Sequence, residues 1–145
     1  MERALLLVKP DGVAAGITDD VLAAVWQRGG SARLVGEFRL DAQLVDLWYP
    51  EICDEPGYRD TVRFLTSGPL RLIEVVSPGA FALTRAVKRE WRAAYRTQRQ
   101  RGMLHCPDGP VDFAHEWALF APLAEGSGIP SSGPVAYPWR QRVAR

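Results

Sequence analysis

Residues 5–10 read Leu-Leu-Leu-Val-Lys-Pro, an uninterrupted apolar run that ends at a charged residue and a proline. A short apolar run bounded in this way is typical of a strand that is buried on both faces of a sheet. We therefore expect a central strand over Leu5–Val8. Any chemistry is expected to begin where this strand stops, at Lys9-Pro-Asp-Gly12.

Two helices are predicted from apolar residues that recur on one face. We expect Thr18 to cap the first helix, which carries two aspartates in its first turn and ends at Gly29-Gly30. The second helix is expected to start at Ser77-Pro78. Its apolar stripe would face the sheet and its basic residues would face solvent, the stripe being Ala80, Leu83, Val87 and Trp91 and the basic residues Arg85, Lys88, Arg89 and Arg92.

The remaining strands are predicted from alternation and from branched residues. Arg33–Leu40 alternates as a half-buried outer strand does, and Leu70–Val76 is rich in branched residues. Two short helices are expected between these strands, one capped by Asp41 and one around Tyr58–Leu65. We expect one turn of helix near residues 109–114, and then a last strand over Trp117–Ala121.

The expected order of elements is β-α-β, then the short helices, then β-α-β. This order is typical of a ferredoxin-like α+β domain, a βαββαβ arrangement with a four-stranded antiparallel sheet and helices on one face. We place this single domain at residues 1–122. Residues 123–145 are rich in glycine, serine and proline, and we expect them to form an extension without a core of its own.

Composition narrows the class of protein. A chain of 145 residues that is 47% hydrophobic can close one core. The net charge of +1 argues against a dedicated nucleic-acid-binding protein, although Arg85–Arg101 holds seven basic residues against the single acid Glu90. Cys53 and Cys106 indicate reduced thiols, and the N-terminal apolar run is too short for a signal or membrane segment. We therefore expect a cytoplasmic protein that does not bind membranes.

His105 has the surroundings of a nucleophile. The carboxylate of Glu116 follows shortly after it and can orient an imidazole on a loop that leads into the last strand. The chain contains neither G-x-x-x-x-G-K-[ST] nor G-x-G-x-x-G, so phosphate binding must rely on side chains. A lone histidine is more often structural, and the functional interpretation depends on Lys9 and the basic helix.

Three motifs in order carry a resemblance to a known family. They are the opening Glu2–Val13 with its Lys-Pro-Asp, the turn Thr66-Ser-Gly-Pro69, and His105-Cys-Pro-Asp108 followed by Glu116-Trp-Ala-Leu-Phe120. Together they resemble the nucleoside diphosphate kinase family from Glu2 to Pro122. The resemblance implies a phosphotransferase that moves the terminal phosphate of a nucleoside triphosphate to a nucleoside diphosphate through a phosphohistidine at His105.

The resemblance also implies the other site residues. His105 and Glu116 would be catalytic, and the residues that bind substrate and phosphate would be Lys9, Tyr49, Arg85, Arg96 and Asp108, with Arg92 and Arg99 as alternatives to Arg96. Asp108 would be structural and in reach of Lys9. Mg²⁺ would accompany the nucleotide without a metal-binding cluster of the protein. A homo-oligomer is implied as well, and Trp48, Trp91 and Trp139 are candidate contact residues.

Structural interpretations stand beside these roles. Lys9 can be a solvated charge at a strand end, Tyr49 can anchor packing through its ring, and the basic helix can be an ordinary solvated face. His115 matches no functional position of the family.

Departures from the family pattern leave the substrate open. Gly57 stands where the family has an aromatic residue that stacks on the base, with Tyr58 as the nearest substitute. Gly102 replaces an asparagine that contacts the ribose, Cys106-Pro107 replaces Gly-Ser, and the segment before His105 is short. Two alternatives follow: a specialised phosphotransferase that acts on an unusual nucleotide or small metabolite, and a non-catalytic nucleotide-binding or interaction protein on the same fold.

Overall fold

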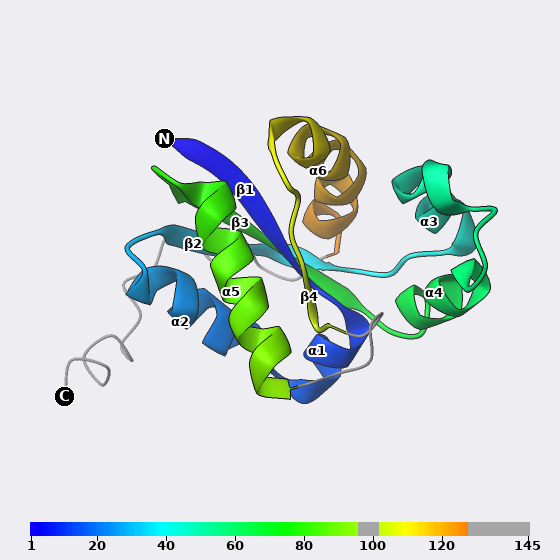
Figure 1. Cartoon of the computed structure of the whole chain (residues 1–145), viewed down its shortest axis with the longest axis horizontal. Coiled ribbons are helices and arrows are strands. Elements are labelled where there is room, and N and C mark those ends of the chain that lie inside the picture. Colours follow the sequence, from blue (N-terminus) through cyan, green and yellow to red (C-terminus); the bar gives the residue numbers. More distant parts are fainter. Residues whose placement is uncertain (96–101, 128–145) are drawn as a thin grey trace.

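The computed structural model describes residues 1–95 and 102–127, which form a four-stranded antiparallel sheet between two layers of helices (Figure 1). The strands are β1 (Glu2–Val8), β2 (Ser31–Phe38), β3 (Leu70–Ser77) and β4 (Leu104–His105). They lie in the order β2-β3-β1-β4, and every neighbouring pair is antiparallel. The predicted ferredoxin-like class is therefore confirmed.

The predicted central strand is β1. It lies between β3 and β4, and its side chains from Ala4 to Val8 are fully buried. Successive residues of a strand point to opposite faces, so Leu6 packs in the core of one face while Leu5 and Leu7 pack in the core of the other. An apolar run without polar interruptions is what a strand buried on both faces requires.

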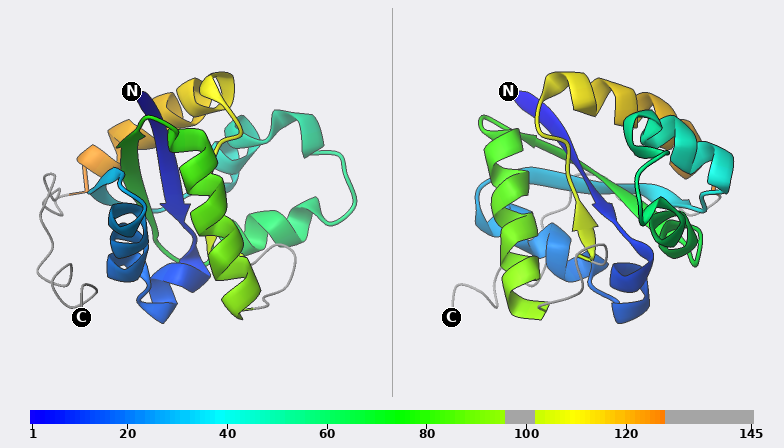
Figure 2. Two further views of the ribbon diagram at one scale, coloured as in Figure 1. Left: turned by 60° about the vertical axis from the view of Figure 1, so that its left-hand side comes forward. Right: turned by 45° about the vertical axis from the view of Figure 1, so that its right-hand side comes forward.

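The first face of the sheet is covered by α2 (Thr18–Gln27) and α5 (Ala80–Tyr95), the two long helices predicted from the sequence (Figure 2). The predicted stripe of α5 faces the sheet, with Leu83 and Val87 buried and Trp91 packed against the same core. Ile17 rather than Thr18 is the N-cap residue of α2. The Thr18 hydroxyl instead accepts a hydrogen bond from Arg71 at 3.2 Å.

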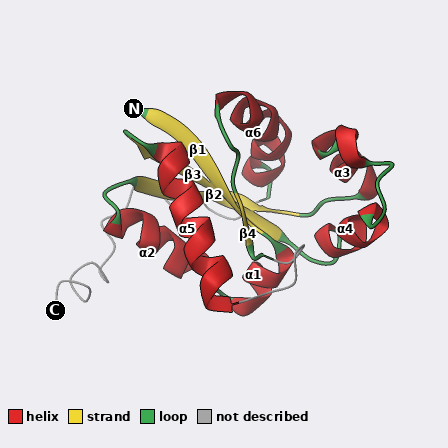
Figure 3. Cartoon of the chain, in the orientation of Figure 1, coloured by secondary structure: helices red, strands yellow, loops and turns green. Residues whose placement is uncertain are grey.

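The second face carries the main difference from the sequence prediction. Residues Pro110–Glu125 form one helix, α6, so the strand predicted over Trp117–Ala121 is wrong, and β4 comes earlier in the chain (Figure 3). Because a short apolar run fits a buried strand and a buried helix equally well, periodicity alone did not separate them. Pro110 in the first turn, a position that proline favours, was the available helix signal.

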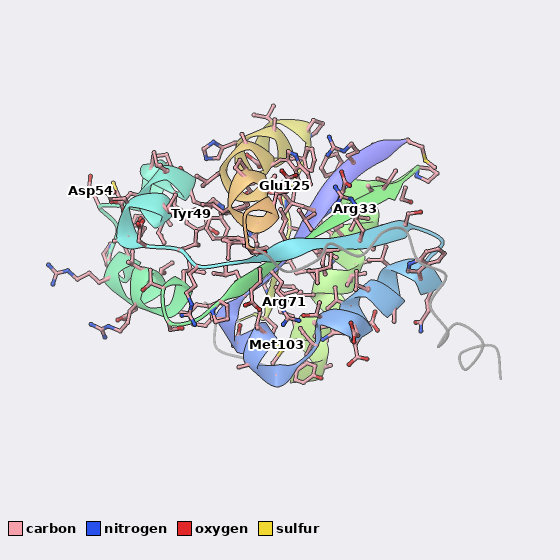
Figure 4. The ribbon with its side chains drawn as sticks, turned by 180° about the vertical axis from the view of Figure 1, so that it is seen from behind. Arg33, Tyr49, Asp54, Arg71, Met103 and Glu125 are labelled. Carbon is pink, nitrogen blue, oxygen red and sulfur yellow. The ribbon has the colours of Figure 1, made fainter. Side chains whose placement is uncertain are left out.

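The helix α6 lies across the sheet and contacts β2, β1 and β3. Phe120 and Ala124 are fully buried on this face. The helix passes the expected domain boundary at residue 122 and ends at Glu125, which is labelled in Figure 4. Both faces of the sheet are therefore covered, one by the crossover helices α2 and α5 and the other by α6.

Three further helical segments complete the described chain, together with a short α1 (Pro10–Ala15) that was not predicted. They are α3 (Ala42–Trp48), the 3₁₀ turn η1 (Pro50–Ile52) and α4 (Tyr58–Leu65). Asp41 caps α3 as predicted, because its Oδ1 accepts a hydrogen bond from the backbone N–H of Leu44 at 2.9 Å. Within the described residues, no helix has the length and apolar character needed to cross a membrane.

The strand β2 is an edge strand, as predicted, but a bulge interrupts its alternation. The register with β3 shifts between Leu34 and Gly36. As a result Leu34 packs against the core of the first face while Phe38 lies in the core of the second face. Predicted alternation had placed both residues on one side, because a bulge is not visible in the period of the sequence.

Candidate active site

His105 and Glu116 meet as the sequence predicted, but on different elements. His105 is part of the edge strand β4, opposite Leu7 of β1, and Glu116 lies on α6. The Nε2 atom of His105 is 2.8 Å from Oε1 of Glu116. A carboxylate can only accept, so Nε2 carries the proton and the lone pair is left on Nδ1. This tautomer is the one that an imidazole nucleophile needs.

Glu116 is itself held in place by a residue that the sequence did not indicate. The indole Nε1 of Trp48 donates a hydrogen bond to Oε2 of Glu116 at 3.3 Å. The Trp48 ring also meets His105 edge-on, with ring centroids 4.9 Å apart. Trp48 was expected on the surface, in a subunit contact, but it is only 3% exposed. Its indole therefore packs against the histidine and fixes the carboxylate.

A cavity of about 570 Å³ opens beside His105. Tyr49 and Asp108, which the family resemblance implies as substrate-binding residues, line it together with Glu51 and His115. Tyr49 stacks on Trp48 with ring centroids 4.4 Å apart and lies at the end of α3 (Figure 4). Burial, and next the charge of Glu116, raises the pKa of Tyr49, so its phenol keeps its proton at neutral pH and can donate a hydrogen bond.

A second, smaller cavity of about 150 Å³ lies against α5. Its cationic lining consists of Arg85, Lys88, Arg89 and Arg92. Cys106 and Asp108 line both cavities, so the segment that follows His105 borders the cavity of the histidine as well as the cavity of the α5 cations. Arg85 is thus placed on the α5 side of this segment, while the pocket of His105 lies between α3 and α6.

Lys9 belongs to the same basic group. Its backbone N–H donates to the carbonyl of Met103 at 2.8 Å, and Met103, labelled in Figure 4, has a left-handed φ of 63°. Burial lowers the pKa of Lys9 to about 8, and the charges of Lys88 and Arg92 add to this effect, while Asp11 opposes it. No ion pair joins Lys9 to Asp108 among the described side chains. The charges that act on Lys9 are therefore those of α5 and of Asp11.

Gly57 and Tyr58 line neither the cavity of His105 nor the α5 cavity. Arg96 and Arg99 lie outside the described residues, and so does Trp139. Gly57 is exposed at the start of α4, and the neighbouring Tyr58 does not replace an aromatic clamp. The hydroxyl of Tyr58 donates to Asp46 at 2.6 Å and its ring packs on the core of the second face.

His115 lies closer to the site than the sequence indicated. It lines the cavity of His105, and its Nε2 is 3.1 Å from the carbonyl oxygen of Leu47 on α3. It directly precedes Glu116 on α6, and this neighbouring position was the one feature of the sequence that indicated a place near the site. Trp48 likewise precedes Tyr49, but an apolar residue on a helix face gives no sign that its N–H orients a carboxylate.

Comparison with known proteins matches the chain to one family. The family model described as nucleoside diphosphate kinase matches residues 2–125. A nucleoside diphosphate kinase from Thermus thermophilus is 33% identical over 130 residues, which cover 83% of this chain and 95% of that protein. Another, from Ignicoccus hospitalis, is 25% identical over 130 residues, which cover 83% of this chain and 88% of that protein.

Solved structures agree with the sequence matches. A halophilic nucleoside diphosphate kinase from Halobacterium salinarum, solved in complex with CDP, gives a TM-score of 0.71 at 26% identity and covers 82% of this chain and 86% of that chain. A nucleoside diphosphate kinase family protein from Babesia bovis gives a TM-score of 0.73 at 25% identity, with coverage of 83% and 88%. The matched residues 2–125 include the elements that build the site.

Proposed function

The chain belongs to the nucleoside diphosphate kinase family and is a phosphotransferase of that kind, and from this premise we propose that His105 is the residue that carries the phosphate. The observation that carries the proposal is the 2.8 Å contact between Nε2 of His105 and Oε1 of Glu116. This contact leaves Nδ1 as the free nucleophilic atom. It also gives the imidazolium that forms on attack a buried carboxylate partner.

The transfer runs in two matched steps. The lone pair of Nδ1 attacks the terminal phosphorus of a nucleoside triphosphate, the bond from that phosphorus to the bridging oxygen breaks, and the diphosphate leaves with the electron pair. An acceptor diphosphate then attacks the phosphohistidine in the reverse sense and restores the imidazole. The Nε2–H···Oε1 hydrogen bond is kept throughout, so that Glu116 stabilises the positive ring while the nitrogen–phosphorus bond exists.

The remaining predicted residues supply charge and hydrogen bonds around that phosphorus. Phosphoryl transfer depends mainly on positioning and charge neutralisation. Arg85 and Lys9 supply cations on the α5 side of His105, and the Tyr49 phenol supplies a donor in the cavity of His105. We assign Asp108, which lines both cavities, to the positioning of the cations rather than to the chemistry.

Mg²⁺ is proposed to arrive with the nucleotide. Among the residues that the structure describes, no group of three or more His, Cys, Asp or Glu side chains is placed to hold a metal ion. Mg²⁺ prefers oxygen ligands and commonly binds substrate phosphates and water with one or two carboxylates. Besides Asp108 and Glu116, the carboxylates of Glu51 and Asp112 line the cavity and suit this role. When bound, the ion neutralises phosphate charge.

A phosphoenzyme assay tests the proposal. Incubation with Mg²⁺ and ATP should add one acid-labile phosphoryl group, detected by intact-protein mass spectrometry. The chain has two histidines, so peptide mapping assigns the group to position 105 or 115. We expect the label at His105 and its loss in His105→Ala. A wild-type protein that takes up no phosphate would rule out His105 as carrier.

Glu116→Gln gives a finer test of the carrier. The amide keeps the size of the side chain but cannot stabilise an imidazolium with a negative charge, so phosphorylation should slow by about 100-fold or more. A slow but complete reaction would support the proposed role of the carboxylate. An unchanged rate would contradict it.

The acceptor and the assembly are also proposals. Gly57 and the engaged Tyr58 offer no aromatic clamp for the base at these two positions, which favours the alternative of a specialised acceptor. A screen of nucleoside diphosphates against the phosphorylated protein separates this alternative from general activity. We propose a homo-oligomer, tested by light scattering, and a cytoplasmic location, supported by the two free cysteines Cys53 and Cys106.

A further inference from the structure

The basic residues of α5 form a row of like charges that does not stabilise the helix itself. Arg85, Lys88, Arg89 and Arg92 are spaced three or four residues apart, where like charges repel and destabilise a helix. Glu90, the acid of this helix, is paired with Arg28 of α2 at 2.7 Å. Among the described residues, no acidic side chain pairs with any member of the row. The row therefore has the charge of a binding surface for anions.

Arg92 has a defined place in this row. A Cβ atom on Gly102 would lie 3.2 Å from Nε and 3.7 Å from Nη2 of Arg92, so the guanidinium lies over a residue that has no side chain. Gly102 is buried and comes shortly before His105 on the same stretch of chain. From Arg85 to Arg92 the row extends about 10 Å along the helix axis, since each residue adds about 1.5 Å.

Lys88 joins the row to Lys9. Both Lys88 and Arg92 act on the charge of Lys9, and Lys88 lines the α5 cavity together with Cys106. The charges of Lys88 and Arg92 on α5 thus act on Lys9 at the end of β1, and the charge of Asp11 opposes them there. The α5 cavity is lined by four cations against the one carboxylate of Asp108. This excess of positive charge suits a ligand with several negative charges, such as a chain of phosphate groups.

The same surroundings offer little to a nucleobase. The aromatic residues that line the cavity of His105 are Trp48 and Tyr49, and these two rings stack on each other. Tyr58 is bound to Asp46, and the α5 cavity has no aromatic residue in its lining. Charge, rather than base stacking, dominates the contacts that the described residues can make with a nucleotide.

We propose that this protein recognises its phosphate donor through the phosphate chain, held by Lys88 and Arg92 as well as Arg85, and that inorganic tripolyphosphate therefore also phosphorylates His105. The inference rests on the proposed role of His105. The Nδ1 lone pair attacks a terminal phosphorus of tripolyphosphate, the bond to the bridging oxygen breaks, and pyrophosphate leaves with the electron pair. The phosphohistidine is the same as the one formed from ATP, so the phosphate passes on to ADP.

The test compares two donors on the full chain. Wild-type protein is incubated with Mg²⁺ and either ATP or tripolyphosphate, and phosphohistidine is followed by intact-protein mass spectrometry. Addition of ADP after the tripolyphosphate reaction should yield ATP, measured by luciferase. We expect phosphorylation with both donors. Phosphorylation by ATP without phosphorylation by tripolyphosphate overturns this inference and leaves the proposed function standing, whereas no reaction with either donor overturns both.

Variants test whether the named cations are responsible. Arg92→Ala should slow the reaction with tripolyphosphate by about tenfold or more, since a charge-assisted hydrogen bond is lost. Arg92→Lys, which keeps the positive charge, should restore part of the rate. Arg28→Ala removes a cation that contacts α5 outside the cavity and should leave the rate unchanged. Equal rates for wild type and Arg92→Ala would overturn the assignment.

Discussion

Trp48 and Glu116 are joined by a buried hydrogen bond, in which the indole Nε1 donates to Oε2 over 3.3 Å. The other carboxylate oxygen accepts from His105, so one carboxylate connects α3, α6 and β4. Each contact restricts the other because both use the same rigid group. The orientation of the nucleophile is therefore set by a residue that has no reactive atom.

Replacing Trp48 with phenylalanine should reduce the rate of phosphoryl transfer. Trp48→Phe keeps an aromatic ring beside His105 but removes the donor to Glu116, a loss of about 1 kcal/mol for one hydrogen bond. We expect kcat to fall by about three- to tenfold while KM stays near that of the wild type. Steady-state kinetics measure both constants.

Trp91→Phe is the matched control for this change. Trp91 packs against the core of the first face, and its Nε1 is buried without a hydrogen-bond partner among the described residues. Its replacement should leave kcat unchanged. If the two variants lost activity equally, the effect would come from general packing and not from the carboxylate.

The pH dependence of nucleotide binding should follow Lys9. Its pKa is lowered to about 8 by burial and by Lys88 and Arg92, so the ammonium loses its proton as the pH rises through this value. A neutral amine binds phosphate weakly, and KM should therefore increase above about pH 8. Lys9→Arg keeps its charge and should flatten the profile. A wild-type KM that stays constant across this range would contradict the assignment.

The same pKa predicts the sign of the effect on stability. Between about 8 and the ordinary value of 10.5, the unfolded chain keeps a proton on Lys9 that the folded protein has released. Stability therefore rises with pH in this window relative to a variant without the amine. Urea unfolding of the wild type and of Lys9→Met, at the two ends of the window, measures the difference. A difference of the opposite sign would mean that the folded protein raises this pKa.

The sequence predicted those parts of the fold whose local pattern is compatible with only one type of secondary structure. The apolar run of β1 and the stripe of α5 each satisfy a single period, and both elements were predicted correctly. The segment Trp117–Ala121 is compatible with a strand and with a helix. The helix α6 is favoured because 16 helical residues can cover the sheet and bring Glu116 to His105. That advantage is tertiary and cannot be read from a window of five residues.

The site likewise contains contacts that the sequence predicted and contacts that it did not. The contact between His105 and Glu116 was predicted because both residues carry chemistry in their own side chains. The contacts of Trp48 with Glu116 and of Arg92 with Gly102 were not predicted, because the two residues of each pair are distant in the chain. Contacts of this kind follow from the packing of elements rather than from motif spacing.

The two cysteines should differ sharply in reactivity. Cys106 is 4% exposed, and burial raises the pKa of its thiol, so little thiolate forms at neutral pH. Cys53 is exposed. Iodoacetamide should therefore modify Cys53 in the native protein and both residues in urea, as counted by mass spectrometry. Cys53→Ser should remove the native reaction, and modification of Cys106 in that variant would contradict the buried position.

Substitution of Gly36 should test the packing of α6 on the sheet. A Cβ atom at this position would lie 2.1 Å from the carbonyl oxygen of Ala124 and 2.8 Å from its carbonyl carbon, and both are backbone atoms that cannot rotate away. Gly36→Ala therefore forces α6 away from β2, and overpacking of this kind costs about 1–3 kcal/mol. Gly79→Ala meets no atom within 4 Å and serves as the control in urea unfolding.

The Gly36→Ala variant should also lose activity. Glu116 lies on the same helix as Ala124, so a displaced α6 carries the carboxylate away from Nε2 of His105. Errors in position of about 1 Å can already reduce a rate by about 100-fold. We expect the phosphorylation rate to fall even at temperatures where the variant remains folded by circular dichroism. A variant that unfolds like the wild type and is phosphorylated at the same rate would show that the end of α6 is not packed on β2, and the orientation of Glu116 would then need another support.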